Sequence, residues 1–270
     1  MKRLSLINNI KDNIVTLDEE NSDALFLDFS LCQSNKITLN FLEGSFDLLV
    51  IPCPNKEMII NQNSNSYLKI GMIGKGDISN FKISANLDEN STIDSYFADF
   101  STGINHTVVT INLNKKGAKA NWHLASLSSQ SDKKEFEVSI FHNSPYTYAQ
   151  SDNYGVCKNE GKLVFSGTSK ILNKSIKSKT YQNAKIMVFD RLSNAVAKPI
   201  LKIDENDIEA SHAAVVGKIN DDHLFYLTSR GISEKEAKEL ITYGYLKPIL
   251  QGFSDQEVID DINNLIEGRM

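Results

Sequence analysis

Arginine is nearly absent from this chain of 270 residues, where it occurs at positions 3, 191, 230 and 269. Four scattered guanidinium groups are too few to build a site that clamps phosphates or carboxylates through paired hydrogen bonds. The formal net charge of −5 also argues against a nucleic-acid-binding surface, which requires clustered Lys and Arg. We therefore expect no nucleic-acid partner.

Long apolar runs are missing too. No segment approaches the ~20 residues that span a bilayer, and the basic residues 2–3 are followed by a polar-interrupted stretch instead of a signal-peptide core. The three cysteines, Cys32, Cys53 and Cys157, form an odd and scattered set. Such a set is typical of reduced thiols rather than of a disulfide framework. We therefore predict a cytoplasmic protein without a membrane span.

Short stretches with a period of two dominate residues 14–203. Apolar, β-branched and aromatic residues alternate with polar ones, and Asn, Ser, Asp or Gly separate the stretches. Clear examples are residues 14–17, 24–29, 36–41, 108–113, 136–141 and 162–165. So many strands must protect their sheet edges as a sandwich, a barrel or a stacked solenoid. Turn-then-strand units recur without a fixed length, which favours an irregular β-helix and leaves a large sandwich open.

The last fifty residues change to helical spacing, with recognisable start and stop signals for three short helices. These signals are Asn220 and Gly231 for the first helix, Ser233 with Glu236 and then Gly244 for the second, and Ser254 with Glu257 for the third. We therefore divide the chain into a β-helix core, residues 1–218, and a helical segment, residues 219–270.

Motifs for nucleotide and metal binding are weak. The sequence GMIGKG at 71–76 has too short a spacing for a phosphate loop, and Gly76 stands where a Mg²⁺-binding hydroxyl is required. We predict a turn there and no nucleotide bound by this chain. There is no CxxC motif and no His pair at helical i, i+4 spacing.

Three histidines in the strand region admit two interpretations. Successive coils could stack His106, His123 and His142 into a ladder, or the three could be separate strand residues that never meet, which is the favoured interpretation. Cys157 could serve as a soft metal ligand, although a buried cysteine is more often a small hydrophobe.

His212 lies where the β-rich region meets the helices. Its neighbour Ser211 would point to the opposite face of a strand, so the two cannot form a nucleophile–base pair. The residues alone leave open whether His212 has a functional or a purely structural role.

The region 198–249 resembles the C-terminal signature of the SufB/SufD family of iron–sulfur cluster assembly scaffold proteins. The matching motifs are KPILKI at 198–203, SHAAVVG at 211–217 and LFYLTSRGI at 224–232. The sequence SHAA in place of the SufB-like EHEA, and the lack of a cysteine within 188–196, resemble the SufD type. The resemblance implies a mainly β protein, with a right-handed parallel β-helix (β-solenoid) body and a small C-terminal α-helical segment.

The resemblance also implies partners and roles. It implies a non-catalytic scaffold subunit of a SufBCD complex, paired with a SufB-like subunit and carrying a SufC-like ATPase on its C-terminal helices, around Leu224, Phe225, Leu240 and Ile241. His212 matches the family histidine at the partner interface, a candidate ligand for iron or a transient iron–sulfur cluster shared with the partner. A neutral imidazole suits iron. Flavin is not expected, because strands begin where family members usually carry an N-terminal helical region.

Two alternatives remain. The strand-rich body alone also fits a β-solenoid carbohydrate-binding or carbohydrate-active protein, although cleavage would call for convergent carboxylates with Lys or Arg on one face. A homodimer that does the work of both scaffold subunits is disfavoured by the missing upstream cysteine.

Overall fold

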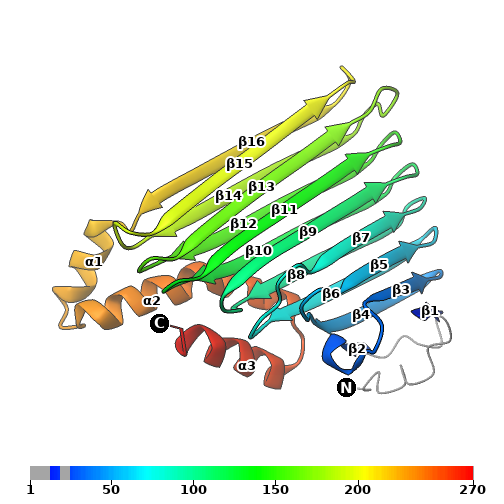
Figure 1. Cartoon of the computed structure of the whole chain (residues 1–270). Helices are drawn as coiled ribbons and strands as arrows, with labels where there is room; N and C mark the ends of the chain where they lie inside the picture. Colours follow the sequence, from blue (N-terminus) through cyan, green and yellow to red (C-terminus); the bar gives the residue numbers. More distant parts are fainter. Residues whose placement is uncertain (1–12, 19–24, 270) are drawn as a thin grey trace.

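A stack of parallel coils forms the body of the protein. The computed structural model describes residues 13–18 and 25–269. Within them, sixteen strands form two parallel sheets of eight strands each, with the odd-numbered strands in one sheet (sheet A) and the even-numbered strands in the other (sheet B) (Figure 1). The chain thus changes sheet at every strand and builds a β-solenoid, which confirms the predicted β-helix. Residues 1–12, where we expect no signal peptide, and Ala24 lie outside the described residues.

The strands lengthen along the chain, from four residues in the first coil to ten in the last coils. Their bounds are β1 Ile14–Leu17, β2 Leu25–Asp28, β3 Lys36–Phe41, β4 Gly44–Ile51, β5 Glu57–Gln62, β6 Ser66–Gly74, β7 Lys82–Leu87, β8 Thr92–Asp99, β9 Ile104–Leu113, β10 Lys119–Ser128, β11 Lys133–His142, β12 Tyr148–Cys157, β13 Lys162–Ile171, β14 Lys179–Val188, β15 Asn194–Ile203 and β16 Glu209–Lys218. A 3₁₀ turn, η4 (Phe29–Leu31), follows β2.

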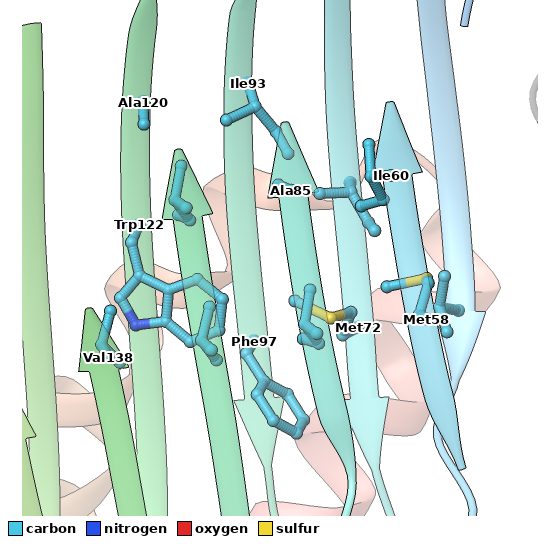
Figure 2. Close-up of a cluster of buried hydrophobic side chains, with 14 of the residues drawn as sticks. Met58, Ile60, Met72, Ala85, Ile93, Phe97, Ala120, Trp122 and Val138 are labelled. Carbon is cyan, nitrogen blue, oxygen red and sulfur yellow. The ribbon is translucent and has the colours of Figure 1, made fainter. Parts of the chain in front are cut away.

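The period of two in the sequence decides which side chains fill the solenoid. Along β9, for example, buried residues alternate strictly with partly or fully exposed ones, because successive side chains of a strand point to opposite faces. Figure 2 shows inward-facing residues of neighbouring strands in the core. Among them, Phe97 and Trp122 meet edge to face with their ring centroids 6.4 Å apart. The interior is therefore a packed hydrophobic core and not a pore.

The helical segment follows the strands directly. It consists of α1 (Asp221–Thr228), α2 (Glu234–Leu246), the 3₁₀ helix η5 (Lys247–Gly252) and α3 (Gln256–Glu267). The predicted cap at Asn220 is confirmed, since its side chain accepts from the backbone N–H groups of Asp222 and His223. The predicted capping box of Ser233 and Glu236 is confirmed as well.

Two predicted helix signals are wrong. The second helix does not stop at Gly244 but continues to Leu246, because Leu246 is fully buried and this burial outweighs the ~1 kcal/mol cost of a helical glycine. The third helix is capped by Asp255, which accepts from the Glu257 N–H at 2.9 Å, and not by Ser254. The hydroxyl of Ser254 instead contacts the Lys69 ammonium at 3.1 Å.

A second core joins the helices to the outer face of sheet B. Outward-facing residues of the sheet, such as Ala98 and Ala125, pack with Leu246 and Ile262 of the helices. Figure 1 shows α2 and α3 lying along the solenoid. Past the end of α3, the Arg269 guanidinium donates to the Phe100 carbonyl at 2.9 Å and pairs with the carboxylate of Asp132. The helical segment is thus fixed to the strands by both packing and charge.

Two glycines permit this close approach. A Cβ at Gly252 would lie 2.1 Å from the Tyr96 ring, and a Cβ at Gly71 would lie 2.7 Å from the Phe253 ring. Both distances are far below van der Waals contact, so any larger residue would force the helical segment away from sheet B. Gly244 has open space around its Cβ position.

We expect Gly252→Ala to lower the free energy of unfolding by about 1–3 kcal/mol, because the added methyl group overlaps the Tyr96 ring. Gly244→Ala is the matched control and should stabilise the protein by roughly 0.5–1 kcal/mol, since alanine is the better helix former. Urea denaturation of both variants measures the difference. Equal stabilities would mean that Gly252 is not in tight contact with the sheet.

Candidate functional site

The last coil leaves the solenoid open at one end. In β14 the inward-facing residues Gln182, Ala184 and Ile186 are buried, because the next strand covers them. Their register partners in β16 are His212, Ala214 and Val216, and all three are exposed. No further strand covers β16 within the described residues. His212 therefore lies on the inner face of the last coil, at the mouth of the solenoid.

Polar groups line the interior beneath His212. Gln182, its register partner, is only 6% exposed. The Gln182 Nε2 group donates to Ser169 Oγ at 2.6 Å, and Thr180 donates to the same hydroxyl at 2.9 Å. The Gln182 Oε1 atom is buried without a hydrogen-bond partner. The interior beneath the open end thus contains polar side chains beside the apolar Ala184 and Ile186.

The end coil also exposes two long strand edges. β15 and β16 each have ten residues, and among residues 13–18 and 25–269 each pairs on one side only, so their other edges present unpaired backbone N–H and C=O groups. Apolar side chains accompany these edges, with Val215 56% exposed and Ile200 42% exposed. Long edges of this kind are a ready template for pairing with another strand.

A second exposed apolar surface lies on α1 and α2. Phe225 is 74% exposed and Leu240 is 53% exposed, while Leu224 and Ile241 are partly buried. Figure 1 places α1 beside the ends of the last strands, farther from the solenoid than α2. We call the exposed side chains Phe225, Tyr226 and Leu240 the helical apolar surface. The predicted docking residues thus lie on two neighbouring helices, although two of the four are not fully exposed.

The structure separates the other histidines and excludes a ladder. His106 and His142 belong to sheet A and His123 belongs to sheet B. His106 pairs with Glu137 at 2.9 Å on the surface. His123 stacks on the Tyr96 ring with a centroid distance of 4.7 Å. These contacts agree with the interpretation of separate strand histidines.

Cys157 is a structural thiol. It is fully buried, its Sγ donates to the Gly161 carbonyl at 3.0 Å, and burial raises its pKa to about 11. Across residues 13–18 and 25–269, no three His, Cys, Asp or Glu side chains are grouped as metal ligands. The same residues contain no helix of the length and apolarity that a bilayer crossing requires.

His142 is buried inside the solenoid. Its Nδ1 atom lies 2.8 Å from Thr147 Oγ1, its Nε2 atom has no partner, and burial lowers its pKa to about 4. An unfolded chain binds a proton near the ordinary value of 6.5. Between these two pH values the unfolded state holds a proton that the folded state does not.

We therefore expect His142 to make the protein less stable as the pH falls from about 6.5 to about 4, by roughly 3 kcal/mol in total. The His142→Gln variant should lose this part of the pH dependence, whereas His106→Gln at the surface should retain it. Urea denaturation of the three proteins across this range measures the effect. Parallel pH profiles for His142→Gln and the wild type would contradict the assignment.

The topology and the two surfaces define a class of protein, a parallel β-solenoid with an open terminal coil and a docked helical segment. The family model for the SUF system FeS cluster assembly, SufBD core domain, matches residues 54–245. The chain therefore belongs to the SufB/SufD family.

Two of the similar curated proteins are SufD proteins. The chain is 32% identical to the iron-sulfur cluster assembly protein SufD of Bacillus subtilis over 135 residues, which is 50% of this chain and 31% of the relative. It is 28% identical to SufD of Escherichia coli over 131 residues, 47% of this chain and 31% of the relative. A SufBD family protein of Staphylococcus epidermidis is 26% identical over 155 residues, 57% of this chain and 33% of the relative. The chain thus spans about a third of the length of these relatives.

Proposed function

We propose that this chain is a SufD-like, non-catalytic scaffold subunit in cytoplasmic iron–sulfur cluster assembly. Family membership supports this role, and the observation that carries it furthest is the uncovered end coil. An inner wall bearing His212, two free ten-residue strand edges and exposed valines together form a surface suited to a second β-solenoid. A SufB-like subunit is the proposed occupant, because it would continue both sheets by strand pairing.

His212 is proposed to face the cluster or iron that the complex handles as its cargo. The imidazole is exposed on the inner face of the last coil, where a docked partner would enclose it. A histidine supplies a single nitrogen ligand, and iron requires several. The remaining ligands are therefore proposed to come from the partner subunit, so that the site would lie at the interface and be shared by both subunits.

The helical apolar surface is proposed to bind a SufC-like ATPase. Phe225, Tyr226 and Leu240 are large side chains that stay exposed although a buried core lies close by. Aromatic side chains of this kind act as anchors at protein interfaces. The Arg230 guanidinium lies over the Tyr226 ring, 4.5 Å from its centroid, and adds a polar contact at the rim. Nucleotide binding is assigned to the ATPase and not to this chain.

We expect Leu240→Asp to abolish co-purification with the SufC-like ATPase, because a carboxylate would be desolvated in the apolar contact. Pairing with the SufB-like subunit should persist, since the end coil is unchanged. Tyr146→Asp is the matched control, because Tyr146 is 51% exposed in the turn before β12, at the end of the strands opposite to the one that continues into α1. Retention of the ATPase by Leu240→Asp, or its loss in Tyr146→Asp, would count against the helical apolar surface.

For the cargo site, we expect His212→Ala to leave both partners bound and to reduce cluster assembly on the complex by about tenfold or more, because even the groups that support a metal ligand are typically worth about 10–100-fold. His106→Ala is the control, because it removes an exposed strand histidine elsewhere on the solenoid. Ultraviolet–visible absorption of the reconstituted complex follows the cluster. Unchanged assembly by the His212→Ala complex would refute a ligand role for this residue.

A further inference from the structure

Two cysteines occupy equivalent places in neighbouring coils at the first end of the solenoid. Lys36 of β3 and Glu57 of β5 are register partners. Cys32 lies four residues before Lys36, and Cys53 lies four residues before Glu57. The Glu57 N–H donates to the Asn35 carbonyl at 2.7 Å, so the parallel register begins just before the strands. The two cysteines therefore follow one another along the solenoid axis.

Both cysteines are partly buried and pack against the main hydrophobic core. Neighbouring rungs of a sheet lie about 4.8 Å apart, and disulfides join Cα atoms separated by about 4.4–6.8 Å. The stacking of the two coils is compatible with this range, and Cys53 lies near enough to Cys32 to contribute to the raised pKa of its thiol. In the described structure both are free thiols.

Hydrogen bonds hold the connection that carries Cys32 against the neighbouring coil. The Cys32 Sγ atom donates to the Asp28 carbonyl at 3.4 Å. The Lys56 ammonium donates to the Cys32 carbonyl at 2.9 Å and to the Ser34 carbonyl at 2.8 Å. The connection that carries Cys32 is therefore tied to the residue three positions after Cys53.

We propose that Cys32 and Cys53 are a redox-convertible dithiol, which a two-electron oxidant of the peroxide class closes into a disulfide between neighbouring coils. One thiolate attacks a peroxide oxygen, the O–O bond breaks, and a sulfenic acid forms as water leaves. The second thiol then attacks the sulfenic sulfur, an S–S bond forms, and a second water leaves. The two sulfurs are oxidised together by two electrons and the peroxide is reduced.

The electrostatics of the pair set the rate of this step. Burial raises the pKa of Cys32, with upward contributions from Asp28 and from Cys53 itself that Lys56 partly offsets. Burial also raises the pKa of Cys53. Since only the thiolate is nucleophilic, oxidation should be slow at neutral pH and faster in alkali. The pair would thus remain reduced during brief exposure to peroxide and close during sustained exposure.

The position of the two cysteines indicates how a disulfide between them would affect the solenoid. The β1–β3 and β2–β4 ladders align four residues each, whereas the β10–β12 ladder aligns ten. The first coils therefore have the fewest rung hydrogen bonds and should separate most readily. A disulfide at this position would hold together the two coils that have the fewest hydrogen bonds between them. The His212 coil lies at the opposite end, so this inference does not depend on the proposed function.

Peroxide treatment of the full chain tests the proposal. We expect intact mass to fall by two hydrogen atoms, two of the three thiols to resist alkylation under denaturing conditions, and peptide mapping to link Cys32 with Cys53. Dithiothreitol should reverse the change, and oxidation should speed up at alkaline pH. The oxidised protein should melt roughly 5–10 °C higher than the reduced protein.

Three variants control the experiment. Cys157→Ala should still form the link, whereas Cys32→Ser and Cys53→Ser should form no disulfide within the chain. Peptide mapping uses the wild-type protein, so the result holds even if one variant folds poorly. Disulfides only between chains, a link that includes Cys157, or sulfinic acid at both sulfurs without a link would each overturn the proposal.

Discussion

The parallel register between successive coils is the constraint on which the rest of this structure depends. Each strand obtains its hydrogen-bond partners from the coils before and after it, and each inward-facing side chain is covered by the residue one rung further on. Ten aligned residues join β12 to β14, and ten join β14 to β16. Stability therefore comes from the contacts between successive coils. Among the described residues, the coils at the two ends have a neighbouring coil on one side only.

The two ends of the solenoid differ in the length of their uncovered strands. In the described part of the chain, the first coil has strands of only four residues, so it has little edge to leave unpaired. The last coil has strands of ten residues, with exposed valines beside a free edge. Natural sheets normally shorten, charge or cover such edges, because uncovered edges promote aggregation. A long and apolar uncovered edge is therefore the feature that supports the proposed pairing with a second β-solenoid.

Sequence reasoning predicts local features well when the physical cause is local. The alternation in residues 36–41 and 108–113 follows from the strand period alone, and Asn220 and Ser233 cap helices through hydrogen bonds to residues two or three positions away. Gly244 fails as a stop signal because burial of Leu246 in the second core decides where the helix ends. That burial depends on sheet B, which lies far away in sequence.

The candidate site could be predicted only in part, for a related reason. His212 is noticeable in the sequence, and a strand pattern implies that Ser211 and His212 face opposite ways. The pattern does not say which of the two faces inward, because that depends on the register with Gln182 of the preceding coil. For the same reason, the sequence does not predict that His123 lies on the outer face while His142 is buried. The sequence does not single out Gln182, because the feature that distinguishes it is a buried Oε1 atom without a hydrogen-bond partner in the solenoid interior.

The connection between the two candidate surfaces is short and stiff. β16 ends at Lys218 and α1 begins at Asp221, so two residues separate the strand that bears His212 from the helix that carries Phe225 and Tyr226. α2 is in turn held to sheet B by the second core. A proposed ATPase that moved α1 would therefore pull on the end of β16 directly, because a two-residue connection has little slack to absorb the motion. The order of strand, histidine and helices in the sequence would thus couple the two proposed surfaces mechanically.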